Sequence, residues 1–410
     1  MLDALSLDAR AAAAAAALVA LPGVLVVRSP WRAMPLVSLA FWVVSWTWDF
    51  GGSRTRVLHV LLLMFAALAL LRVLRPGPLP ARGRAQVLIV LAAIVLAAPG
   101  ATRAVPAGAR APLEALTAQL LAWHDGWPLS FEPLSPRQPF EADGVAALTA
   151  DVVLLSGAPV HRALFAVTAA ADVALLLALW SLASIRWPPG RAAIVAAAAL
   201  LPAAAVAEAS AVLAAAFAVE AAALWHDRRG HPSAFTAGAC MAAGLATNAA
   251  TALGALLLAM LVVRVRSSSF ADVAPASLVP GRRRTAVWTA VVLALPLFLW
   301  RVPPLGGPTF DWPAASEVVT HDERAALAWI RDHTRPLDLV CAPDVPAARW
   351  IPALAARATT APLRPGWPRP EGPCAVRISL SGLLPPGVNG HESPAFRAGG
   401  AAVWTTSQKR

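Results

Sequence analysis

The chain has 410 residues, of which 58% are hydrophobic and 14% charged, and its mean hydropathy is +0.62. Soluble globular proteins carry about a quarter charged residues, so this composition excludes a disordered chain and a wholly soluble fold. The net charge of +11 fits either nucleic-acid binding or arginine-rich cytoplasmic loops of a membrane protein. The positions of the arginines decide between these two classes.

Apolar stretches that approach the roughly 20 residues needed to cross the hydrocarbon core as a helix recur along the chain. They predict about ten spans, at residues 11–27, 35–48, 57–71, 86–101, 163–185, 192–207, 209–225, 234–248, 249–263 and 285–300. The eighth and ninth stretches border each other, and only Thr247, Asn248 and Thr251 mark a turn between them. One merged span there would move every later segment to the other side.

Arginine is distributed unequally between the two sides that these spans define. With the N-terminus outside, the inner loops are 28–34, 72–85, 186–191, 226–233 and 264–284. They hold fifteen arginines against two acids, whereas the outer segments up to residue 162 hold seven arginines against nine acids. This asymmetry follows the positive-inside rule and favours separate eighth and ninth spans. The basic excess is therefore a topology signal, and nucleic acid is not expected as a partner.

Two segments lie outside the predicted spans, both on the outer face. They are the loop at 102–162 and the tail at 301–410, so the chain divides into a transmembrane domain (1–300) and a C-terminal extracytoplasmic domain (301–410). In the tail, Thr320 and Glu323 fit a capping box, and residues 337–341, 374–380 and 401–405 have strand composition. We expect an all-α polytopic membrane bundle with a small C-terminal α/β domain.

Cys341 and Cys374 both fall in predicted strands of the tail. An extracytoplasmic domain permits a disulfide, but the sequence does not show whether the two Cα atoms come close enough. The sequence therefore leaves undecided whether this disulfide forms.

The outer loop concentrates residues that suit chemistry at a membrane surface. Residues 113–123 predict a short helix with leucines along one stripe and Glu114 pointing away from it. A positioned carboxylate is what glycosyl transfer from a lipid-linked donor needs, because the acceptor hydroxyl loses its proton as it attacks the anomeric carbon. The leaving polyprenyl phosphate carries charge that arginine, histidine or a metal must stabilise.

The run from Glu114 to Gly157 (EALTAQLLAWHDGWPLSFEPLSP, then PFEADGVAALTADVVLLSG) resembles the main outer loop of bacterial polytopic glycosyltransferases of the GT-C superfamily. The segment from Asp322 to Arg357 looks like the opening of the extracytoplasmic domain that many such proteins carry. The resemblance implies transfer of a sugar from a polyprenyl-phosphate carrier to an acceptor at the outer face of a bacterial-type inner membrane. The family commonly has an Asp followed by a His four residues later, whereas here Glu114 precedes Thr117 and Ala118. The resemblance therefore leaves the use of a divalent metal undecided.

The candidate catalytic residues are Glu114 as base, with Glu208 or Asp143 assisting. The candidate substrate-binding residues are His124, Asp125, Trp127, Arg137, His161 and Arg162. Each also has an ordinary structural explanation. Glu114 suits the first turn of a helix electrostatically, Asp143 suits a helix cap, His124 and Asp125 suit a turn before Gly126, and the cations suit interfacial snorkelling.

Two other functions fit the same sequence. Asp172 lies near the middle of the predicted span 163–185, where a charge is expensive, and a proton path through it would indicate a transporter or flippase for a lipid-linked substrate. A non-catalytic envelope scaffold, with the tail as its partner-binding module, is the third possibility. Membrane lipid is a partner in all three cases, and the acceptor is not identified by the sequence.

Overall fold

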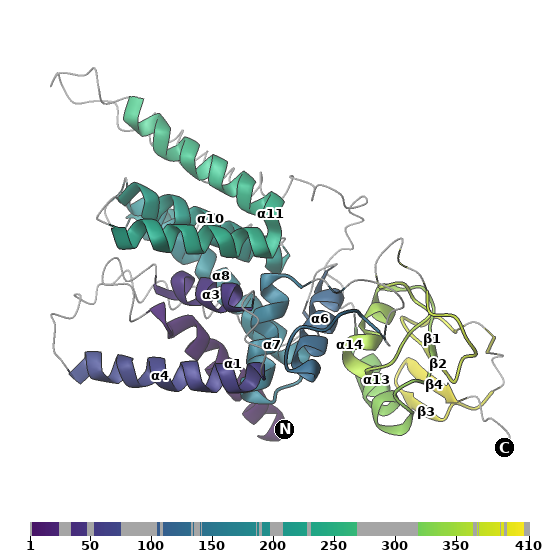
Figure 1. The fold of residues 1–410 in the computed structure, drawn as a ribbon. Coiled ribbons are helices and arrows are strands. Elements are labelled where there is room, and N and C mark those ends of the chain that lie inside the picture. The colour runs from purple at the N-terminus through teal and green to yellow at the C-terminus, as the bar shows by residue number, and fades with distance from the viewer. Residues whose placement is uncertain are drawn as a thin grey trace.

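The computed structural model describes residues 2–23, 34–46, 53–74, 105–106, 110–132, 134, 140, 142–185, 187, 191–196, 208–227, 231–268, 319–363, 367, 369–385, 387–388 and 392–405. These residues form a helical bundle with a small α/β domain beside it (Figure 1). The bundle contains α1 (Leu2–Ala20), α3 (Met34–Ser45), α4 (Arg54–Leu74), α6 (Ala111–His124), α7 (Gly144–Ser156), α8 (Val160–Ser184), α10 (Ala209–Asp227) and α11 (His231–Ser268). The spans predicted at 86–101 and 285–300 lie outside the described residues.

Three of the described helices are long and apolar enough to cross a membrane. They contain the segments Arg54–Leu71, Val160–Ser184 and Thr236–Leu261. Shorter apolar helices cover Pro35–Ser45, Gly144–Ser156 and Ala209–Trp225. The chain is therefore mostly helical and has three candidate membrane-spanning helices among the described residues, and the predicted number of ten is not confirmed.

Helix α11 has a sharp kink at the turn predicted between the eighth and ninth spans. Asn248 has non-helical backbone angles (φ −158°, ψ 97°), and its side-chain oxygen accepts a hydrogen bond from the Thr251 N–H at 3.1 Å. Asn248 thus caps the second arm of α11. The first arm lies beside α10 and the second diverges from it (Figure 1).

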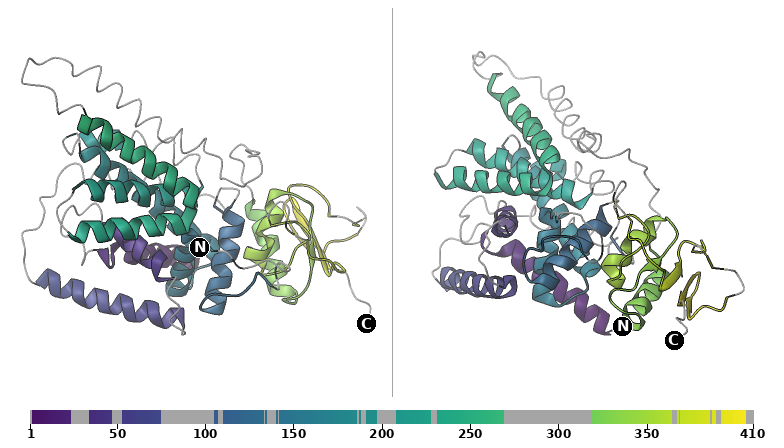
Figure 2. Two further views of the ribbon diagram at one scale, coloured as in Figure 1. Left: turned by 45° about the horizontal axis from the view of Figure 1, so that its top comes forward. Right: turned by 45° about the vertical axis from the view of Figure 1, so that its right-hand side comes forward.

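Helices α6 and α7 lie across one end of the bundle, on the side of the C-terminal domain (Figure 2). The end of α3 reaches this point, because the Trp46 indole donates to Asp151 of α7 at 3.1 Å. The start of α4 does too, because the Arg54 N–H donates to the Asp125 carbonyl at 2.9 Å. The kink of α11 also meets the start of α7 here. We call this the loop end of the bundle.

A buried ion pair joins α4 to α7 at the loop end. Arg54 donates through Nε to Asp151 Oδ1 at 3.0 Å and through Nη2 to Asp151 Oδ2 at 2.9 Å, and the two side chains are 6% and 0% exposed. The guanidinium also donates to the Ser45 hydroxyl at 2.9 Å and lies 4.5 Å from the Trp46 ring centre.

The C-terminal domain packs two short helices against a four-stranded sheet. It contains α13 (His321–His333), β1 (Val340–Cys341), η2 (Pro346–Trp350), α14 (Ile351–Ala355), β2 (Val376–Ser379), β3 (Phe396–Ala398) and β4 (Ala401–Thr405). The strand order is β1-β2-β4-β3, with β1 parallel to β2 and the other pairs antiparallel. The capping box of Thr320 and Glu323 is confirmed. The three predicted strands are confirmed as well: β1 and β2 are shorter than predicted, and β4 covers the predicted 401–405 in full.

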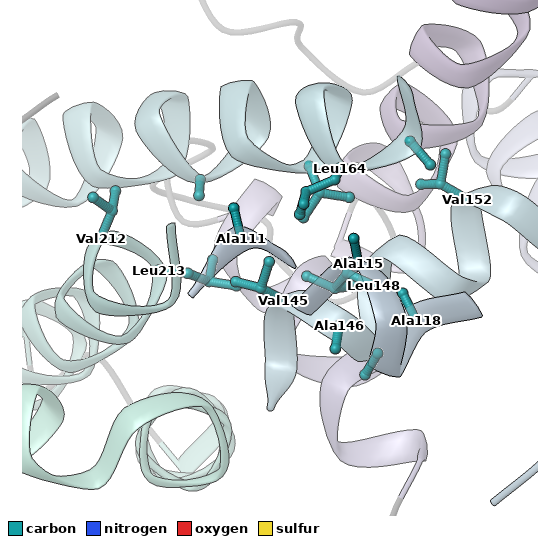
Figure 3. Close-up of a cluster of buried hydrophobic side chains, with 14 of the residues drawn as sticks. Ala111, Ala115, Ala118, Val145, Ala146, Leu148, Val152, Leu164, Val212 and Leu213 are labelled. Carbon is teal, nitrogen blue, oxygen red and sulfur yellow. The ribbon is translucent and has the colours of Figure 1, made fainter. Parts of the chain in front are cut away.

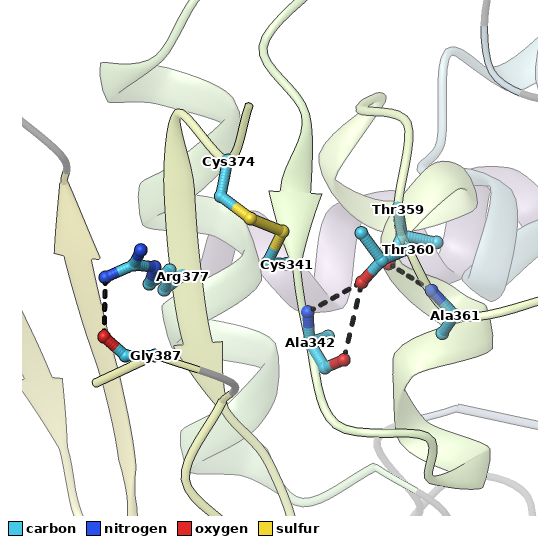
Figure 4. Close-up of a disulfide and its surroundings, with 8 residues drawn as sticks. All are labelled: Cys341, Ala342, Thr359, Thr360, Ala361, Cys374, Arg377 and Gly387. Carbon is cyan, nitrogen blue, oxygen red and sulfur yellow. Dashed lines mark hydrogen bonds between the residues drawn. A yellow bond between two sulfur atoms is a disulfide. The ribbon is translucent and has the colours of Figure 1, made fainter. Parts of the chain in front are cut away.

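The disulfide that the sequence left undecided is present between Cys341 and Cys374, whose Cα atoms are 5.6 Å apart (Figure 4). It ties β1 to the segment that leads into β2. Closing a loop of this length, with a separation of 33 residues, stabilises a domain by about 3–4 kcal/mol, because the crosslink reduces the entropy of the unfolded chain.

We expect reductant to lower the unfolding temperature of the C-terminal domain, measured by calorimetry on the full chain. A Cys341→Ser variant should be insensitive to reductant, and an equal response of the two proteins would contradict the assignment.

An aromatic chain connects the bundle to the C-terminal domain. Ring centres are 6.3 Å apart for Trp46 and Trp127, 5.6 Å for Trp127 and Phe140, 5.1 Å for Phe140 and Phe131, and 5.2 Å for Phe131 and Trp367. Since Trp367 belongs to the C-terminal domain, this domain is held against the loop end.

Candidate functional site: a carboxylate cluster at the loop end

The structure brings together the three acids that sequence reasoning selected as catalytic. Glu114 lies in the first turn of α6, Asp143 directly precedes α7, and Glu208 directly precedes α10. Both other carboxylates lie within electrostatic range of Glu114, as does Arg110 one turn before it on the chain. Three segments that are far apart in the sequence therefore meet at one point.

Local sequence explains how the helix starts converge. Pro112 suits the first turn of α6, where its missing N–H leaves no bond unmade. Asp143 is the N-cap of α7 and accepts from the Ala146 N–H at 2.8 Å. A Cβ at Gly144 would overlap the Thr247 hydroxyl, so only glycine lets α7 begin against the kink of α11.

An apolar cluster fixes these helix starts relative to one another. Ala115 of α6, Val145 of α7, Leu164 of α8 and Leu213 of α10 are all fully buried and belong to the cluster drawn in Figure 3. Each lies within a few residues of a candidate site residue. The positions of the polar groups are therefore set by close packing, which tolerates little displacement.

Burial and neighbouring charges together raise the pKa of Glu114. Its side chain is 5% exposed, and burial raises its pKa well above the ordinary value, with further increases from Asp143 and Glu208. Arg110 and the Ser210 hydroxyl oppose this rise. Burial also raises the pKa of Asp143 and of Glu208, against the attraction of Arg110.

The three carboxylates differ in the hydrogen bonds and ion contacts that they already form. Asp143 caps α7, and Glu208 lies 4.0 Å from Arg110 Nε. Glu114 Oε1 is buried and accepts no hydrogen bond from the residues that the structure describes. Glu114 therefore presents a buried oxygen that these residues leave without a hydrogen-bond donor. Its burial also differs from the solvated first-turn acid that was the ordinary explanation.

The predicted residues at the other end of α6 have structural or surface positions. Asp125 Oδ1 accepts hydrogen bonds from the N–H and the hydroxyl of Thr55, each at 2.7 Å. Partial burial raises the pKa of Asp125, but the bonds from Ser53 and Thr55 outweigh it and lower the pKa overall. His124 and Trp127 are exposed, and Arg137 lies outside the described residues.

A second group, the basic cluster, lies where α8 meets the C-terminal domain. It consists of His161, Arg162, Arg324 and Arg331, because all three guanidinium groups are within electrostatic range of the His161 ring. Arg162 Nε is 3.4 Å from Asp8 Oδ1. Sequence reasoning selected His161 and Arg162 but missed Arg324 and Arg331, whose spacing of seven places them on one face of α13 without showing what that face contacts.

Within the described ranges, no three His, Cys, Asp or Glu side chains approach closely enough to hold a metal ion. The carboxylate cluster supplies the oxygen ligands that hard cations prefer, but its three acids do not share one coordination point. We derive no metal-dependent step from it.

Comparison of the chain with protein-family models, with characterised proteins and with solved structures found no match.

Proposed function

We propose that the chain is a polytopic membrane glycosyltransferase that moves a sugar from a polyprenyl-phosphate carrier to an acceptor. The observation that carries the proposal is Glu114, a buried carboxylate with one oxygen free, placed beside two further acids at the loop end. In this account the loop end is the outer face of a bacterial-type inner membrane and the ten predicted spans form the bundle. The disulfide in the adjoining domain supports an oxidising compartment.

The transfer step uses Glu114 as general base. Its free oxygen takes the proton of the acceptor hydroxyl while the acceptor oxygen forms a bond to the anomeric carbon. The bond from that carbon to the phosphate oxygen breaks, and the electron pair leaves with the lipid phosphate. The carboxyl must be deprotonated to accept this proton, so Glu114 acts as a base above its raised pKa.

The basic cluster is placed to receive the departing phosphate. His161 lies one turn before Leu164 on α8, and Leu164 packs in the same apolar cluster as Ala115, the neighbour of Glu114 (Figure 3). The N-terminus of α8 adds its partial positive charge at the same place. Arginines here oppose the positive-inside tendency, so topology does not explain them.

Arg324 provides a test of this phosphate assignment. Arg324→Gln should raise the KM for the lipid donor about tenfold, the effect of losing about 1.4 kcal/mol of binding, with kcat little changed. Arg335→Gln, at another arginine of the C-terminal domain, is the matched control and should keep the wild-type KM. Equal KM values for all three proteins would remove Arg324 from donor binding.

The proposed function is tested by direct assay of the purified chain in proteoliposomes. Radiolabelled pentoses and hexoses on short polyprenyl phosphates are offered together with an envelope glycan extract, and released polyprenyl phosphate is measured. We expect release with at least one donor. If correctly folded protein, with its disulfide intact, releases none from any donor, the proposal fails.

Asp172 favours the transporter as the second candidate. It lies within the membrane-spanning α8, is 8% exposed, and forms no ion pair with the residues that the structure describes. A transporter requires Asp172→Asn to abolish movement of a lipid-linked substrate across the vesicle membrane. Unchanged movement in that variant would eliminate this candidate.

A further inference from the structure

Three large apolar side chains are exposed around the C-terminal end of α6. Trp123 is 51% exposed, Trp127 52% and Leu129 95%. Soluble surfaces rarely leave such side chains adjacent and uncovered, and a patch of this kind marks an interaction site. We call residues 123–129 the aromatic tip.

The aromatic tip is fixed at the start of the membrane-spanning α4. The Thr55 N–H and hydroxyl donate to Asp125 within the tip, both at 2.7 Å, and the Arg54 N–H donates to the Asp125 carbonyl at 2.9 Å. The tip therefore keeps a defined height along the α4 axis.

The exposed surface of α4 changes character a short distance from the tip. Arg56 and His59 are exposed first, and a long apolar surface follows at Val60, Leu63, Met64, Leu68, Leu70 and Leu71. At a rise of about 1.5 Å per residue, Thr55 lies about 7–8 Å above the start of that surface. The headgroup region of a bilayer is about 5–8 Å thick on each side, so the tip falls within this layer.

We propose that the aromatic tip inserts into the headgroup region of the bilayer and anchors the loop end at a fixed depth. Tryptophan is favoured at this depth, because its ring is apolar while its N–H meets the polar headgroups. Continuity with the lipid-facing surface of α4 identifies the bilayer as the occupant. Because α6 runs crosswise to α4 (Figure 1), the anchor would hold Glu114, at the other end of α6, close to the same depth.

The test places an environment-sensitive fluorophore on Leu129→Cys in nanodiscs. The chain has three cysteines, of which Cys240 is buried and two form the disulfide, so labelling is selective. Leu337→Cys, at another exposed leucine, in the C-terminal domain (78%), is the matched control.

We expect the label at 129 to show blue-shifted emission, strong quenching by lipids with a nitroxide near the headgroup, and loss of quenching by aqueous nickel chelate. The label at 337 should show the reverse. Equal accessibility of both labels to nickel chelate would overturn the proposal. Protection of position 129 from both quenchers would also overturn it, because another protein surface would then cover the tip. Neither result depends on transfer activity, so this proposal can fail while the proposed function stands.

Discussion

Asp151→Ala should destabilise the protein by about 3–5 kcal/mol, because it leaves the buried Arg54 guanidinium without its partner in a site that excludes water. The pair joins α4 to α7 through two hydrogen bonds, and α7 begins at the carboxylate cluster. We therefore expect a large fall in the midpoint of thermal unfolding in detergent, together with loss of the site.

The matched control removes both charges at once. An Arg54→Met, Asp151→Leu double variant replaces the ion pair with apolar groups, and such replacements are often neutral or stabilising. We expect it to unfold near the wild-type temperature. The single variants Arg54→Met and Asp151→Leu complete the cycle. If the destabilisation of the double variant equals the sum of their two destabilisations, the two residues do not interact as described.

Glu114→Gln should lower kcat for sugar transfer by about 10²–10⁴-fold, the usual contribution of a general base, with little change in the KM for the donor. The pH dependence follows from the raised pKa of Glu114. Below that pKa the carboxyl is protonated and cannot accept a proton, so wild-type activity should rise as the pH passes through it. The variant should lose this rising limb.

Glu132→Gln is the control for the loss of one negative charge from the same loop, because Glu132 is exposed. It should keep wild-type kcat and the wild-type pH profile. Full activity in Glu114→Gln, or loss of the rising limb in Glu132→Gln, would assign the base to another residue.

The sequence predicted those features that depend on local pattern or on the side of the membrane. The capping box before α13 needs only Thr320 and Glu323, three residues apart. Glu114, Asp143 and Glu208 were selected because the arginine distribution placed all three on one face. Four other acids of the 102–162 loop share this type and side, so the choice of Glu114 also used the family resemblance. Nothing in the sequence states how close the three residues lie.

Features that depend on tertiary packing were not predicted. Arg54 and Asp151 are 97 residues apart, and no local pattern connects them. Glu114 is buried because α6 packs against the other helices. The leucine stripe shows only that Glu114 points away from it, and does not show that another helix covers that side. Strand β3 has only three residues, Phe396–Ala398, and lies between Pro394 and Gly399. Three residues are too few to show an alternating pattern.

Sided transfer in oriented proteoliposomes tests the central claim most directly. Labelled polyprenyl-phosphate sugar is added to the external leaflet only, and release of polyprenyl phosphate is compared between vesicles whose C-terminal domain is accessible to protease and vesicles whose domain is protected. The account predicts release when the C-terminal domain faces the donor leaflet, and its loss in Glu114→Gln. Release from vesicles with the protected domain alone, or equal release by the Glu114→Gln protein, would contradict it.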